Sequence, residues 1–153
     1  MTAGISNAEL AYKALARARR WLQSARRALE DGRWDDAVYS SQMAVELSSK
    51  GVLLALGIDY PREHDVSDVF VELRDREDLP AWFREEVPAL SRNIAELAEL
   101  RGLAGYGYER GIDADYFKDY APEAYGRAEE HVNTCERLLD ELFGAANSRR
   151  GSR

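Results

Sequence analysis

Apolar side chains recur every three or four residues along most of the chain, which is the spacing of one face of an α-helix. The first of these stripes comprises Leu15, Ala18, Leu22, Ala25 and Leu29. Ser6 or Asn7 can cap the start of this helix, and Gly32 can end it. The pattern therefore predicts a first helix that buries one face.

A second helix is predicted from about Trp34 to Leu56, with a stop at Gly57. Its small and apolar residues lie on more than one face: Ala37, Ser40, Ala44, Leu47, Gly51 and Leu54 on one, with Val38, Val45 and Val52 beside it. A helix that is apolar on several faces is packed on several sides. We expect this helix to be the central helix of a bundle.

The second half of the chain predicts one short helix and two long ones. The short helix follows Asp65, and the next begins at Leu79-Pro80, with Pro88 as a kink or a restart. Its stripe is Val87, Leu90, Ile94, Leu97, Arg101, Ala104 and Tyr108. The last helix is expected at about Pro122 to Phe143, with Ala128, Val132, Cys135, Leu139 and Leu142 inward.

No segment alternates with a period of two over the length of a strand, so the predicted fold class is all-α. Short connections favour antiparallel neighbours, which predicts an up-and-down bundle of four to five helices. We expect residues 1–143 to form a single domain. Residues 144–153 are small, polar and basic, and are expected to be a disordered tail.

Charge and cysteine content narrow the function classes. The chain of 153 residues has a formal net charge of −7, so it is not a general polyanion-coating protein and any nucleic-acid contact must be local. One cysteine and two histidines exclude a typical zinc site, and we expect no metal or cofactor. With no bilayer-spanning run and no signal-peptide pattern, a cytoplasmic protein is expected, with neither membrane nor DNA as a partner.

Arg101 breaks the apolar stripe of the fourth helix, and it allows two interpretations. In the first, it lies near the helix C-terminus and extends to solvent, while Tyr106 and Tyr108 seal the end of the bundle. In the second, a pocket lets Arg101 hold a phosphate while tyrosine hydroxyls exchange protons.

Other charged residues receive simpler interpretations. The first helix carries five arginines, Arg17, Arg19, Arg20, Arg26 and Arg27, which form a solvated face or else a docking surface. Glu46 and Lys50 are spaced to pair along the second helix. His64 is expected to fix its loop by a hydrogen bond rather than act in catalysis, and His131 to lie at the surface or the bundle edge.

Four features, taken in order, resemble the HEPN domain family, the helical domains named for nucleotide binding in higher eukaryotes and prokaryotes. They are the sequence from Ala28 to Val38, the segment Gln42 to Leu47 leading to Lys50, the loop Tyr60 to Val66, and Arg101 with its glycine-tyrosine segment. The resemblance covers nearly the whole chain. It implies an up-and-down helical bundle that commonly dimerises, with its functional motif near the dimer cleft.

The resemblance also implies candidate site residues. In many HEPN members an arginine, four to six residues and a histidine serve metal-independent RNA cleavage. Here Arg101 matches the arginine, and Tyr106 stands in the place of the histidine. In some members a tyrosine two positions later is adenylylated by a minimal nucleotidyltransferase, and Tyr108 matches it. We expect Arg101 and Tyr106 as catalytic residues, Arg101 and Tyr108 as ligand-binding or modified residues, and Glu46, Lys50 and His64 as supporting residues.

Three functions follow as hypotheses. The first is a nucleotide- or RNA-binding component of a toxin-antitoxin-type pair with a minimal nucleotidyltransferase, acting as a homodimer. The second is a metal-independent ribonuclease toxin, although a tyrosine at position 106 is a poor general base at neutral pH. The third is a tetratricopeptide-like interaction module that docks through Arg19 or Arg26 of the first helix. Whether the chain is an enzyme stays open at this point.

Overall fold

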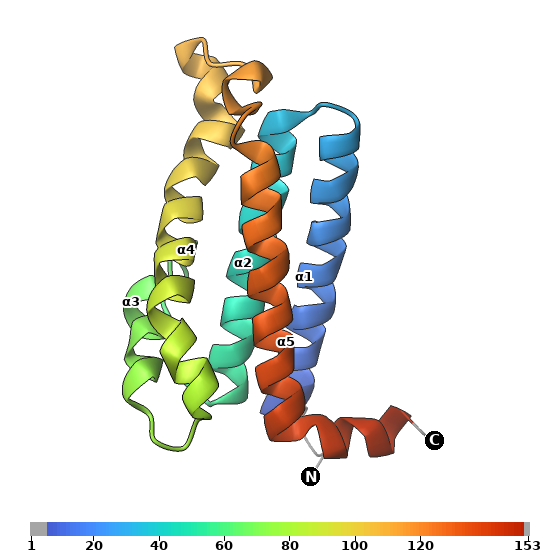
Figure 1. Cartoon of the computed structure of the whole chain (residues 1–153), viewed down its shortest axis with the longest axis vertical. Coiled ribbons are helices and arrows are strands. Elements are labelled where there is room, and N and C mark those ends of the chain that lie inside the picture. The colour runs from blue at the N-terminus through green and yellow to red at the C-terminus, as the bar shows by residue number, and fades with distance from the viewer. Residues whose placement is uncertain (1–5, 152–153) are drawn as a thin grey trace.

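The computed structural model describes residues 6–151, with side chains described through residue 144. It contains five α-helices: α1 (Asn7–Glu30), α2 (Trp34–Ala55), α3 (Ser67–Phe70), α4 (Ala81–Tyr106) and α5 (Ala121–Gly151). Three 3-10 helices lie between them: η1 (Val71–Asp75), η2 (Gly107–Arg110) and η3 (Ala114–Phe117). The four long helices alternate in direction (Figure 1), and no strand occurs among the described residues. The predicted all-α, up-and-down bundle is confirmed.

The ends of the helices follow the local chemistry. The Ser6 side chain caps α1 by accepting a hydrogen bond of 3.2 Å from the Glu9 backbone N–H. Gly32 follows α1 with a φ of +73°, a left-handed conformation that glycine adopts at little cost. Pro88 does not end α4, which continues through it to Tyr106.

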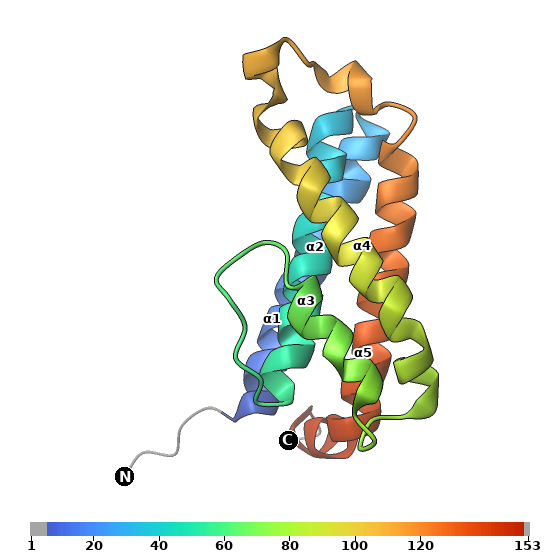
Figure 2. The ribbon, with the colours of Figure 1, turned by 90° about the vertical axis from the view of Figure 1, so that its left-hand side faces the viewer.

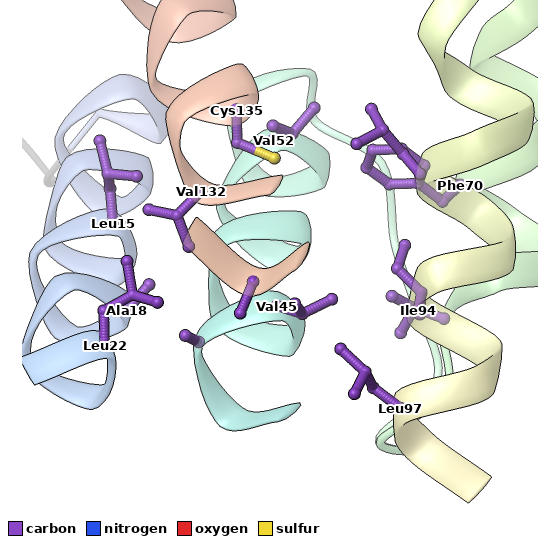
Figure 3. Packing of buried hydrophobic residues seen from close by; sticks show 14 of the residues in the cluster. Leu15, Ala18, Leu22, Val45, Val52, Phe70, Ile94, Leu97, Val132 and Cys135 are labelled. Atoms are coloured by element: carbon purple, nitrogen blue, oxygen red, sulfur yellow. The ribbon is translucent and has the colours of Figure 1, made fainter. Parts of the chain in front are cut away.

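The α2 helix lies at the centre of the bundle, as its sequence predicts. Figure 3 shows Val45 and Val52 of α2 among core residues from the other three long helices. These are Leu15, Ala18 and Leu22 of α1, Ile94 and Leu97 of α4, and Val132 and Cys135 of α5. Helices α1, α4 and α5 all pack on α2, whereas the backbones of α4 and α5 are farther apart and these two helices meet through long side chains, as in the Arg127–Glu96 ion pair of 2.6 Å.

The segment between α4 and α5 lies at one end of the bundle. It contains η2 and η3, and it sits beside the turn that joins α1 to α2 (Figure 2). The candidate residues at the end of α4 are therefore near the end of α1 and the start of α2. This placement brings three helices to the same functional region.

The last helix is longer than the sequence predicts. α5 continues through Gly151, and its final turns bend away from the bundle (Figure 1). Residues 144–151 are thus helical where we expect a disordered tail, and residues 152–153 lie outside the described residues. The domain boundary at residue 143 stays a prediction.

Replacing Leu97 by Ala tests the core assignment. Leu97 is fully buried on α4, so Leu97→Ala is expected to lower the free energy of unfolding by about 2–5 kcal/mol. Urea unfolding followed by circular dichroism measures this difference, with Glu99→Ala, an exposed position of the same helix, as the control. Equal stability of Leu97→Ala and the wild type would contradict the packing of α4.

Candidate functional site

Arg101 lies across the interface between α4 and α2. Its guanidinium carbon is 4.7 Å from the centre of the Tyr39 ring, and its Nη2 donates a hydrogen bond of 2.7 Å to the Tyr39 hydroxyl. One turn further along α4, a Cβ on Gly105 would be only 3.3 Å from the Tyr39 ring. The absence of a side chain at Gly105 therefore leaves room for the ring beneath Arg101.

The contact continues from Tyr39 to α1. The rings of Tyr39 and Trp21 have centres 6.3 Å apart and are inclined by 59°. On α1, the Arg17 guanidinium lies 5.8 Å from the Trp21 ring centre. Two neighbouring aromatic rings thus lie between two arginines across three helices, and we call these four residues, Arg17, Trp21, Tyr39 and Arg101, the ring ladder.

The ring ladder contains polar atoms that the protein leaves unpaired. The Nε of Arg101 and the indole N–H of Trp21 are both buried without a hydrogen-bond partner. Arg101 also has no carboxylate partner among the described residues. Leaving buried donors unpaired costs free energy, and native proteins rarely tolerate it without a compensating role. These atoms mark the ladder as a candidate site for an anionic ligand.

Tyr106 lies on another side of α4 from Arg101. It borders a pocket of about 810 Å³, which Arg110, Tyr120 and Arg127 also line, and Arg101 is not part of that lining. No hydrogen bond joins Arg101 to Tyr106 or Tyr108 within the described part of the chain. The structure brings Arg101 together with Tyr39 instead, a residue that the sequence analysis did not select.

Tyr106 and Tyr108 do not seal the end of the bundle. Their exposed fractions are 58% and 68%, so the interpretation that pairs a solvent-reaching Arg101 with two sealing tyrosines is wrong in this respect. Tyr108 lies in η2, beyond the end of α4. Both hydroxyls are within reach of solvent, where a partner protein can approach them.

The buried carboxylate of Glu46 is the centre of a polar cluster with Gln42 and Lys50 of α2 and the exposed His64 of the following loop. Its carboxylate accepts hydrogen bonds from Gln42 Nε2 and Lys50 Nζ, both at 2.9 Å, and lies 2.7 Å from His64 Nδ1. Burial raises the pKa of Glu46, but the three hydrogen bonds outweigh it and hold the pKa below its ordinary value. The predicted pairing of Glu46 with Lys50 is confirmed, and His64 fixes its loop to the same carboxylate.

The expectation that His131 lies at the surface or the bundle edge is wrong. It is 1% exposed, and its Nε2 lies 2.7 Å from Ser49 Oγ and its Nδ1 3.1 Å from Asn93 Nδ2. Ser49 donates to the Val45 carbonyl, so the Nε2–H tautomer of His131 can donate to Ser49 Oγ while its Nδ1 accepts from Asn93 Nδ2. The sequence does hold the signal, because His131 continues the buried series of Ala124, Ala128, Cys135 and Leu138.

The contacts from Ser49 to His131 to Asn93 have the order of a nucleophile, its base and an orienting amide, but the resemblance goes no further. Ser49 is fully buried, so a substrate cannot reach its hydroxyl. We therefore assign this cluster to the packing of α2, α4 and α5. In the part of the chain that the structure describes, no group of three or more acidic, histidine or cysteine side chains is placed to hold a metal ion.

The comparisons with known proteins support the fold. A family model described as the HEPN domain matches residues 11–141, which is most of the chain. No curated protein and no solved structure matches the chain. None of the described helices has the length and apolar character needed to cross a membrane.

Glu46→Gln is expected to destabilise the protein strongly. Without the carboxylate, the partly buried Lys50 ammonium loses its counter-charge, so the free energy of unfolding should fall by about 3–5 kcal/mol. Urea unfolding at pH 7 measures the loss. The double variant Glu46→Gln with Lys50→Met removes the unpaired charge and should recover part of it. A single variant as stable as the wild type would refute the role of this carboxylate.

The buried His131 predicts a loss of stability in mild acid. Burial lowers its pKa from 6.5 to about 3, so below pH 6.5 the unfolded chain binds a proton that the folded chain does not. This residue should therefore lower the free energy of unfolding by about 2 kcal/mol between pH 7.5 and pH 5. Urea unfolding of the wild type and of His131→Gln at pH 7.5 and pH 5 measures the contribution of His131 to the pH dependence of stability. The same pH dependence in both proteins would show that His131 does not contribute it.

Proposed function

The chain belongs to the HEPN domain family, and from that membership we propose that it binds the phosphate of a nucleotide or an RNA at Arg101, as a component of a toxin-antitoxin-type pair with a minimal nucleotidyltransferase. The observation that supports the proposal most is the state of the Arg101 guanidinium. This group has five N–H donors and a permanent positive charge. Among the described residues, one donor binds the Tyr39 hydroxyl and no carboxylate pairs with the charge.

A phosphate suits this guanidinium. Arginine binds phosphate oxygens through two parallel hydrogen bonds, and the Tyr39 ring holds the side chain in place before the ligand arrives. The overall charge of −7 opposes such a ligand at long range, so recognition has to come from this local cation. The site is therefore suited to selective binding and not to general coating of nucleic acid.

Binding is favoured over RNA cleavage by the positions of the two histidines. His64 is held by Glu46, and His131 is buried and neutral between three helices. Neither contacts Arg101, and the pocket that Tyr106 borders is not lined by Arg101. A general base that works near neutral pH is thus not among the contacts of Arg101 in the described structure. We propose the ribonuclease only as the alternative that the experiment below separates.

The third hypothesis, docking of a partner through Arg19 or Arg26, has less support. Arg19 forms an ion pair of 2.8 Å with Glu136 of α5, and Arg26 lies 3.3 Å from Glu30. These guanidinium groups are already engaged with the protein's own carboxylates. A partner would have to displace those contacts.

We propose Tyr108 as the residue that faces the nucleotidyltransferase. Its ring is well exposed at the end of the bundle, so its hydroxyl is accessible to an enzyme that transfers a nucleotidyl group from a nucleoside triphosphate and releases pyrophosphate. A homodimer, which we also propose, would bring a second Arg101 and a second Tyr108 to the assembly.

Arg101→Ala tests the proposal. Loss of the guanidinium should weaken binding of a fluorescein-labelled single-stranded RNA of ten nucleotides by about tenfold or more, the equivalent of about 1.4 kcal/mol. Fluorescence anisotropy at low salt in EDTA measures the dissociation constant. The matched control is Arg92→Ala, an exposed arginine of the same helix, which should bind like the wild type.

The outcomes separate the candidate functions. Wild-type protein that does not bind the RNA, or Arg101→Ala protein that binds it equally well while folded, would contradict the proposal. A denaturing gel of the same samples detects cleavage. Arg101-dependent cleavage in EDTA would establish the metal-independent ribonuclease instead.

A further inference from the structure

We propose that a pocket between the end of α1 and the start of α2 is a subsite for a nucleobase, next to the phosphate held at Arg101. This inference rests on the proposed function and adds the part of the ligand that the family motif does not address. The pocket has a volume of about 370 Å³. Its lining residues are Trp21, Ser24, Arg27, Arg33, Asp36, Tyr39 and Ser40.

The pocket contains the two rings of the ring ladder. Tyr39 is shared, because its ring contacts Arg101 and also lines the pocket. Trp21 borders the pocket from α1, and both rings are half-buried, which holds them in place and leaves part of each accessible. A nucleobase stacks on such rings irrespective of its sequence, and each stacked base strengthens binding by about 5- to 150-fold.

The edge of the pocket offers hydrogen-bonding groups that the protein does not use. Ser24 and Ser40 line it, and neither hydroxyl makes a side-chain hydrogen bond in the described structure. Ser40 is 7% exposed, and its hydroxyl is not among the fully buried unpaired atoms, so a ligand in the pocket can reach it. A heterocyclic base has donors and acceptors in its plane that match such groups, whereas a purely apolar ligand would leave them unpaired.

One guanidinium at the rim of the pocket can meet an anion attached to the base. Arg33 is bound to Asp36 at 2.6 Å and lies 3.4 Å from Asp31, so two carboxylates already engage this arginine. Arg27 has no carboxylate partner among the described side chains, so its guanidinium is available at the rim. A phosphate on either side of the base can therefore meet Arg27 or Arg101.

The exposed face of α1 favours an RNA strand over a free nucleotide as the source. Lys13, Arg17, Arg20 and Arg27 follow one another along this helix at spacings that place them on one face, and all four are exposed. Salt bridges to these four side chains are absent from the described structure. Successive phosphates of a strand can contact such a row, whereas a mononucleotide reaches only one or two of its members.

The test compares RNA with a strand that lacks bases. Anisotropy is measured with a labelled ten-nucleotide oligoadenylate and with an abasic ribose-phosphate strand of equal length. We expect the wild type to bind the oligoadenylate about tenfold more tightly. Ser24→Leu, which fills the pocket from an exposed helix position and leaves Arg101 untouched, should abolish that preference. Equal affinities of the wild type for both strands would overturn the subsite.

A second measurement reports on the ring itself and does not depend on the Ser24 variant. In a Trp34→Phe, Trp82→Phe protein Trp21 is the only tryptophan, so selective excitation of tryptophan reports on its ring. Stacking of a base should quench this emission as RNA saturates the protein. Unchanged emission at saturation would overturn the proposal. Quenching by AMP with no further gain in affinity for the ten-nucleotide strand would identify a free nucleotide as the source of the base.

The two levels of the proposal fail differently. If RNA binds with the help of Arg101 but without a preference for bases, the proposed function stands and the subsite is wrong. If Trp21 is quenched and Arg101→Ala binds normally, the subsite stands and the phosphate role of Arg101 is wrong. If the wild type binds neither strand nor AMP, both are wrong.

Discussion

Burial of α2 on nearly every side is the constraint on which the rest of the structure depends. Since α1, α4 and α5 all pack on α2, each polar side chain that this helix carries into the bundle needs a partner. The Glu46 carboxylate forms hydrogen bonds with Gln42, Lys50 and His64, and the contact with His64 fixes the loop after α2. Ser49 forms a hydrogen bond with the His131 ring, and Asn93 forms another with the same ring. The polar pairs of α2 thus connect it to α4, α5 and the loop before α3.

This pairing is incomplete at several buried atoms, Gln42 Oε1 and Asn93 Oδ1 among them, and also around Tyr39 near the start of α2, where the candidate site lies. Tyr39 accepts a hydrogen bond from Arg101 and contacts Trp21, but two buried N–H groups around it find no acceptor. The buried charge of Glu46, in contrast, is compensated within the chain by Lys50. At the ring ladder an arginine is held without a counter-charge in a protein whose net charge is −7. A ligand that carries both a negative charge and an aromatic group would supply a counter-charge for Arg101 and a stacking partner for the Trp21 ring.

Hydrophobic periodicity was sufficient to predict the helices, their order and the central place of α2, because a stripe of apolar residues fixes which face of a helix is buried. The same periodicity places His131 in the buried series of α5, but it does not show that Ser49 and Asn93 of two other helices contact its ring. Arg101 broke its stripe visibly, but its partner Tyr39 is 62 residues away and carries no local signal. Arg101 and Tyr106 occupy the two consecutive key positions of the family motif, five residues apart in the chain. Five residues of an α-helix make one full turn plus about 140°, so the two side chains lie on different sides of α4.

The most direct measurement is an NMR titration of the isotope-labelled protein with single-stranded RNA, in which the arginine side-chain and tryptophan indole N–H signals are followed. If Arg101 holds the phosphate and a base lies against Trp21, the signals of these two residues shift together and saturate at the same RNA concentration, while the signal of Arg92 stays in place. Saturable shifts that leave Arg101 and Trp21 unchanged and appear at other arginines would contradict the assignment of the site.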